Sequence, residues 1–202
     1  MKKIHYISGT VIGFFVAIHL FNHLCSIFGA EAHIQVMQTL RIWYRNILFE
    51  SILFVAIGVQ IISGLTLFRA SYNKAVGFYK LKIWTGLYLA FFFLVHSTAV
   101  IAGRYILQLD TNFYFGVAGL NTFPYNLFFV PYYGLAIMAF FGHIASIHSS
   151  RMKRPVVGIK PKSQSAIIVA LGFVLMLFIF YGLTNRFKGV PIPQEYHIMI
   201  GK

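Results

Sequence analysis

The chain has 202 residues, of which 58% are hydrophobic and only 10% are charged, and its formal net charge is +13. A soluble domain carries about 25% charged residues, so this chain has too few polar side chains to cover a water-soluble globule. We therefore expect an integral membrane protein whose basic residues contact anionic lipid, and we do not expect nucleic-acid binding. The single cysteine, Cys25, excludes both an intrachain disulfide and a cysteine-ligated iron–sulfur cluster.

In chain order, five segments are long and apolar enough to cross a bilayer as helices. They cover residues 6–28, 47–68, 81–103, 125–148 and 165–184. The first segment follows Lys2 and Lys3 but has no small-residue cleavage site, which favours a retained membrane helix over a signal peptide. The mixed composition of residues 32–45 predicts a short interfacial helix. The fold class is therefore all-α, with one transmembrane domain of five helices.

The charges predict how this bundle is oriented. Most of the 17 basic residues lie at the ends of the spans that face the same side as the N-terminus. All four acids lie on the opposite side: Glu31, Glu50, Asp110 and Glu195. Because basic loops stay on the cytoplasmic side, we expect a multi-pass protein of the bacterial inner membrane, with its N-terminus in the cytoplasm and its C-terminus outside.

Three histidines, His19, His23 and His96, lie inside apolar spans, where polar groups are costly and often functional. His19 and His23 are four residues apart on one helix, so they share a face. The rise per residue of a helix places His96 at a depth between them. Imidazoles from two helices at equal depth are how a helical bundle holds a haem iron. We expect His96 to bind the iron of haem b together with His19, or less favourably with His23.

Two other interpretations of these histidines stay open. They can serve only as hydrogen-bonding residues between helices, in which case the chain is a haem-free membrane scaffold or a lipid-binding protein. It can also be a small membrane enzyme that acts on a lipid or isoprenoid. The sequence contains neither the His-Glu-x-x-His pattern of zinc proteases nor a glycine-rich phosphate loop.

The remaining histidines lie nearer the ends of the spans. His143 is expected near the cytoplasmic face, where it can serve a second haem, serve a quinone site, or simply be a hydrogen-bonded buried histidine. His5, together with Ser8, can line the same region. His33 and His197 fall in polar segments on the opposite side and are expected to be solvated.

The segment from His5 to Gly9, which reads His-Tyr-Ile-Ser-Gly, resembles the His-Arg-x-Ser-Gly opening of the cytochrome b membrane anchors of succinate dehydrogenase and fumarate reductase. The third span, with His96 followed by Gly103, Arg104 and Asp110, resembles the haem-ligand helix of that family. The resemblance implies that His96 binds haem and that Ser8 lies near a quinone. It also implies flavoprotein and iron–sulfur partner subunits, so that the chain would transfer electrons without being a complete enzyme by itself.

Overall fold

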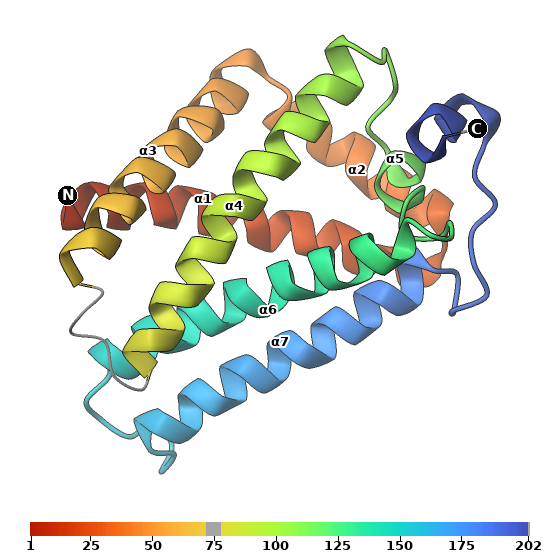
Figure 1. Cartoon of the computed structure of the whole chain (residues 1–202). Helices are drawn as coiled ribbons and strands as arrows, with labels where there is room; N and C mark the ends of the chain where they lie inside the picture. Colours follow the sequence, from red (N-terminus) through yellow and green to blue (C-terminus); the bar gives the residue numbers. More distant parts are fainter. Residues whose placement is uncertain (72–77, 202) are drawn as a thin grey trace.

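The protein is a bundle of five long helices that are long and apolar enough to cross a membrane. The computed structural model describes residues 1–71 and 78–201. The five long helices are α1 (Lys2–Leu24), α3 (Ile47–Ser71), α4 (Phe78–Tyr105), α6 (Asn126–Arg151) and α7 (Pro161–Leu183), as seen in Figure 1. The described part of the chain contains no β-sheet. The all-α expectation is confirmed, and the protein is a multi-pass membrane protein.

Each span expected from hydropathy coincides with one of these helices, and the ends differ by a few residues. The helices carry large apolar side chains on their outward faces, as at Phe14, Val55 and Leu171, which are 72%, 66% and 60% exposed. Such exposure suits contact with lipid, because a helix satisfies its backbone hydrogen bonds internally and needs no polar surface there. The helix α7 begins at a proline, Pro161, which suits the first helical turn because proline has no N–H to satisfy.

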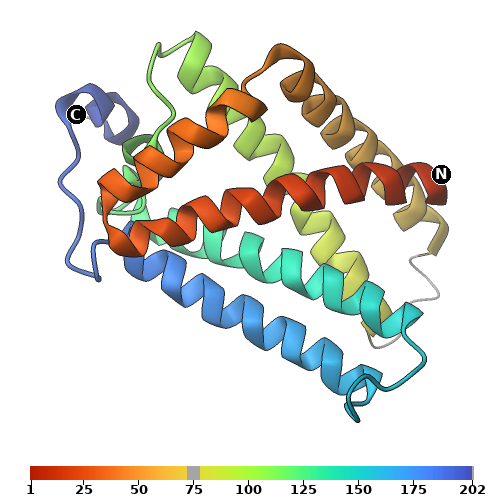
Figure 2. The ribbon, with the colours of Figure 1, turned by 180° about the vertical axis from the view of Figure 1, so that it is seen from behind.

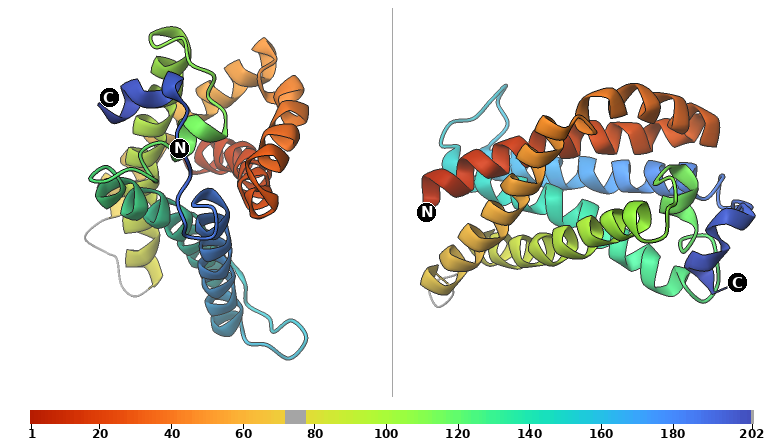
Figure 3. Two further views of the ribbon diagram at one scale, coloured as in Figure 1. Left: turned by 90° about the vertical axis from the view of Figure 1, so that its right-hand side faces the viewer. Right: turned by 90° about the horizontal axis from the view of Figure 1, so that it is seen from above.

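Successive long helices run in opposite directions, so the bundle has two distinct ends. We call the end that holds the N-terminus the N-end and the opposite one the C-end; the right-hand panel of Figure 3 shows the two termini far apart at these ends. The C-end also carries the short helices: η1 (Cys25–Phe28), which continues α1, then α2 (Ala30–Tyr44), α5 (Phe113–Val117) and η3 (Gln194–Ile200). The helix expected at residues 32–45 is therefore present as α2.

The chain turns back at Gly29, and α2 then runs beside the end of α1 (Figure 2). Gly29 has a φ of 110°, which is a conformation that residues with a Cβ rarely adopt. The buried face of α2 is formed by His33 and Met37, which are one helical turn apart. The turn at Gly29 thus decides which residues of α2 face the bundle.

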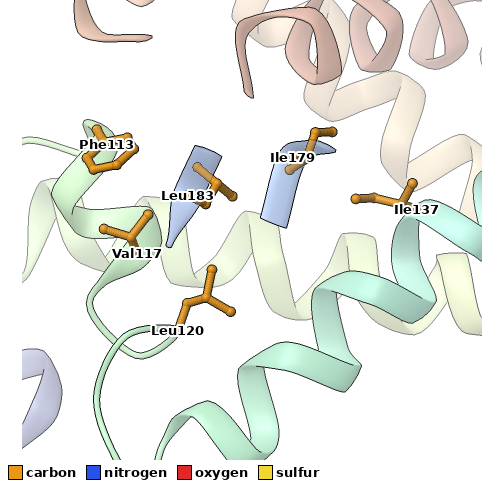
Figure 4. Packing of buried hydrophobic residues seen from close by; sticks show 6 residues of the cluster. All are labelled: Phe113, Val117, Leu120, Ile137, Ile179 and Leu183. Carbon is orange, nitrogen blue, oxygen red and sulfur yellow. The ribbon is translucent and has the colours of Figure 1, made fainter. Parts of the chain in front are cut away.

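The long helices pack as neighbouring pairs: α1 lies against α3, α4 against α6, and α6 against α7. At the C-end, a hydrophobic core joins α5 and the turn after it to α6 and α7, as shown in Figure 4. Its most buried members are Phe113, Val117, Leu120, Ile137, Ile179 and Leu183. The tail is fastened over this region by Tyr196, which is fully buried and donates a hydrogen bond to the backbone oxygen of Asp110 at 3.0 Å. This packing holds the loop after α4 against the rest of the C-end.

Candidate functional site

The three histidines expected within the apolar spans come together in the half of the bundle nearer the C-end. His19 and His23 lie on α1, one turn apart, with their Nε2 atoms 3.1 Å apart. His96, on α4, places its ring centroid 6.1 Å from that of His19. Since α1 packs mainly on α3 and α4 mainly on α6, the imidazoles come from two helices that are not each other's main packing partners.

A fourth histidine, His33 of α2, belongs to the same cluster. Its Nε2 lies 3.3 Å from Nδ1 of His23 and 3.3 Å from the side-chain nitrogen of Asn22. Only 2% of His33 is exposed, so the expectation that it is solvated is wrong. The physical reason is the reversal of the chain at Gly29, which turns the buried face of α2 toward α1. The spacing of His33 and Met37 on one face was the signal available in the sequence.

The protonation state of His33 follows from its surroundings. Burial lowers the pKa of His33 to about 4, and the nearby His19 and Arg41 act in the same direction. At pH 7 the imidazole of His33 is therefore neutral, and one of its ring nitrogens can accept a hydrogen bond. We call His19, His23, His33 and His96 the histidine cluster from here on.

Aromatic rings hold two of these imidazoles in place. Phe15 stacks on His19 with 5.6 Å between the ring centroids and an angle of 17° between the planes. Phe92 stacks on His96 at 5.0 Å and 11°. Each phenylalanine is on the same helix as its histidine, one turn earlier, which is the spacing that brings side chains into contact. These contacts fix the ring orientations and surround the imidazoles with apolar groups.

Three arginines gather at the C-end, close to the histidine cluster. Asp110 pairs with Arg41 at 2.8 Å and with Arg45 at 3.6 Å. Arg104 of α4 pairs with Glu50 of α3. Three guanidinium groups thus face two carboxylates, which leaves an excess of positive charge. Phe15 of α1 lies between these arginines and the histidine cluster. Its ring contacts both His19 and Tyr44, the residue that precedes Arg45 in the sequence.

Asp110 is expected to stabilise this end of the bundle in a pH-dependent way. Burial opposes ionisation of Asp110, but the hydrogen bond from Arg41 and the charges of Arg41 and Arg45 bring its pKa below the ordinary 3.8. The stabilisation is therefore fully present above the ordinary pKa and is lost as the pH falls through the lowered pKa of the folded protein. We expect Asp110→Asn to melt at a lower temperature than the natural protein at pH 7, and the difference between the two melting temperatures to become smaller as the pH is lowered to 3.

The matched control for this prediction is Glu31→Gln, which removes an exposed carboxylate with no ion-pair partner among the described residues. It should melt like the natural protein at both pH values. If the melting temperature of Asp110→Asn lies equally far below that of the natural protein at pH 7 and at pH 3, the ion pairs are not the source of the difference. Circular dichroism of the detergent-solubilised protein measures both transitions.

A second polar group lies at the N-end, between α1 and α3. Ser8 donates a hydrogen bond to Oε1 of Gln60 at 2.6 Å, and Nε2 of Gln60 lies 3.2 Å from Nε2 of His5. The other ring nitrogen of His5 lies 2.9 Å from the hydroxyl of Ser63. The two residues that the sequence paired, His5 and Ser8, are thus joined through Gln60, a residue that sequence reasoning missed. Its polar side chain in the middle of an apolar span was the available signal.

His143 lies at the N-end, apart from the histidine cluster. Its Nδ1 is 3.2 Å from the hydroxyl of Thr85 and 3.1 Å from the backbone oxygen of Lys82, both on α4. These contacts are those of a hydrogen-bonded histidine between two helices. Its position near the end of the bundle that holds His5 agrees with the depth expected from the sequence.

The chemistry of the histidine cluster decides which ligands it suits. Among residues 1–71 and 78–201, no three His, Cys, Asp or Glu side chains are arranged as a ready metal-binding group. Imidazole nitrogens are common ligands both of metal ions and of haem iron.

Comparison with protein-family models, with curated proteins and with solved structures finds no match to this chain. The assignment of a function therefore depends on the residues themselves. The strongest features are the histidine cluster in the membrane, the arginines beside it and the hydrogen-bonded group at the N-end.

Proposed function

We propose that the protein is a b-type cytochrome of the membrane that transfers electrons to or from quinone. The observation that carries the proposal is the approach of His19 and His96 from two helices, with ring centroids 6.1 Å apart. Imidazole nitrogens from two different helices are the donor atoms with which a helical bundle would hold a haem iron.

In this proposal His96 and His19 would hold the iron of haem b, and His23 is the alternative to His19. Haem supplies one-electron exchange when it is bound. The protein residues would hold it and keep water away: Phe15 and Phe92 orient the two imidazoles. The excess positive charge of Arg41, Arg45 and Arg104 suits the two carboxylates that haem b carries.

The hydrogen-bonded group at the N-end is the proposed quinone site on that side. A quinone presents carbonyl oxygens, which accept hydrogen bonds, and Ser8, Gln60 and His5 carry polar hydrogens within one connected group. The resemblance to the anchors of succinate dehydrogenase and fumarate reductase extends the proposal to flavoprotein and iron–sulfur partner subunits. The excess of basic residues at the N-end favours an orientation with that end in the cytoplasm, in the bacterial inner membrane.

The absorption spectrum of the purified protein tests the proposal. Protein from haem-replete cells should show a strong Soret band and, after reduction, an α-band near about 560 nm, as expected for two imidazole ligands. The pyridine haemochrome assay then gives the number of haems per chain. A colourless protein that is folded and monodisperse would exclude the cytochrome. The hydrogen bonds among His19, His23 and His33 would then be structural contacts in a haem-free scaffold, a lipid-binding protein or a lipid enzyme.

A further inference from the structure

A cavity of about 310 Å³ opens at the C-end of the bundle. Its walls come from the turn between α1 and α2, from α5, from the end of α7 and from the tail that follows it. This volume is at the lower limit of cavities that bind small organic molecules. None of the residues assigned above to haem or quinone binding lines the cavity.

The lining of this C-end cavity combines aromatic rings with hydrogen-bond donors. Phe113, Tyr114 and Tyr181 provide the rings, and Asn185 and Arg186 provide amide and guanidinium groups. No carboxylate is present among the described residues that line it. Such a lining suits a flat ring that carries oxygen acceptors, because the ring can pack on the aromatic side chains while its oxygens accept hydrogen bonds.

The backbone that presents Arg186 to the cavity has an unusual conformation. After α7 ends at Leu183, three consecutive residues other than glycine, Asn185, Arg186 and Phe187, have φ angles of 49°, 59° and 64°. The turn is closed by backbone hydrogen bonds from Arg186 to Tyr181 at 2.7 Å and from Gly189 to Thr184 at 2.9 Å. Left-handed conformations of such residues persist where the surroundings impose them, and they often occur at functional sites.

A continuous series of rings links the cavity to the histidine cluster. The ring of Phe113, which lines the cavity, lies 5.3 Å from that of His33. The ring of His33 lies 5.2 Å from that of His23, which is 4.5 Å from His19. A ring bound in the cavity against Phe113 would therefore be separated from the proposed haem ligands only by side chains in direct contact.

We propose that the C-end cavity binds the head group of a quinone-class molecule, as a second site distinct from the one at Ser8 and His5. This inference rests on the proposed quinone-linked function. Arg186 and Asn185 donate hydrogen bonds to the carbonyl oxygens of the ring, and the neighbouring aromatic side chains pack on its faces. The site lies on the side of the bundle opposite to the basic N-end, and therefore opposite to the cytoplasm in the orientation expected from the charges.

Binding of a fluorescent quinolone analogue of quinone to the full-length protein in lipid nanodiscs tests this proposal. The first variant is Arg186→Asn, because asparagine tolerates the left-handed backbone at this position. It should weaken binding about tenfold or more, since hydrogen bonds from charged groups are among the stronger ones.

The matched controls are Lys188→Asn, which removes an exposed charge two residues from Arg186, and Tyr105→Phe, at the exposed end of α4. Neither residue lines the cavity, and both controls should bind like the natural protein. Ser8→Ala and Gln60→Leu report on the N-end in the same assay. Binding that Arg186→Asn leaves unchanged overturns the C-end site, and if Ser8→Ala abolishes that binding the quinone-linked function still stands.

Different experimental outcomes overturn the proposed function and the proposed C-end site. If the natural protein binds no analogue at all, both the quinone-linked function and the C-end site are overturned. If it is colourless but binds the analogue in a manner that depends on Arg186, the haem assignment is excluded and the C-end site is supported. The absorption spectrum and the binding curve together therefore separate the two proposals.

Discussion

His96→Ala is expected to abolish haem binding, so that the purified variant loses both the Soret band and the reduced α-band. An alanine provides no lone pair for iron, and none of the three remaining members of the histidine cluster lies on α4. Phe92, which stacks on His96, would be left facing an empty space. His19→Ala should have the same effect, unless His23, one turn away with its Nε2 3.1 Å from that of His19, takes its place.

The outcome for His23→Ala then separates the two possible partners of His96. If His19 is the ligand, His23→Ala keeps most of the haem and shifts the spectrum, because the imidazole beside His19 is lost. If His23 is the ligand, haem is lost with His23→Ala and kept with His19→Ala. A haem content that is unchanged in His96→Ala would exclude the assignment of α4 as the helix that provides a ligand.

A matched control removes an imidazole elsewhere at the C-end. In His197→Ala the lost ring lies in η3, where its Nε2 is 3.1 Å from the backbone oxygen of Ile192. This variant should keep the full spectrum. Size-exclusion chromatography of each variant shows whether loss of colour accompanies a folded protein, and hemin added to folded His96→Ala should not restore the spectrum.

Gly182→Ala is expected to destabilise the bundle strongly, because α7 and η1 meet at this glycine. A Cβ at position 182 would lie 2.1 Å from Oγ of Ser26 and 2.6 Å from the backbone nitrogen of Ile27. Backbone atoms cannot move aside as a flexible side chain does, so the two segments must separate. Overpacking of this kind costs about 1–3 kcal/mol. Thermal unfolding of the variant in detergent should occur at a clearly lower temperature than that of the natural protein.

The control for this prediction is Gly13→Ala, also within a long helix. Beyond the neighbouring residues and backbone of its own helix, no atom of the described residues lies within 4 Å of a Cβ built at Gly13, and alanine is the better helix former by up to about 1 kcal/mol. This variant should be as stable as the natural protein or slightly more stable. Equal melting temperatures for Gly182→Ala and Gly13→Ala would mean that α7 and η1 do not pack as closely as described.

The sequence by itself determined the five spans, because the membrane leaves the backbone so few choices. An apolar segment of about 20 residues in lipid has to be helical to satisfy its N–H and C=O groups. The expected spans therefore agree with the helices, and they differ mainly at ends such as Lys2 and Pro161. Lysine side chains can extend from a helix end toward water, so α1 begins earlier than its apolar run. Because the first span had to be helical, the spacing of four residues was enough to place His19 and His23 on one face.

The tertiary structure alone decided which residues from different segments meet. His33 joins the cluster because the chain reverses at Gly29. Gln60 connects Ser8 to His5 because α3 packs on α1 in one particular rotation. Arg186 lines the C-end cavity because the chain turns through three left-handed residues after α7. Periodicity sets the face of a residue within its own helix, but the partner of that face depends on crossing angles and turns, which are set by packing summed over the whole bundle.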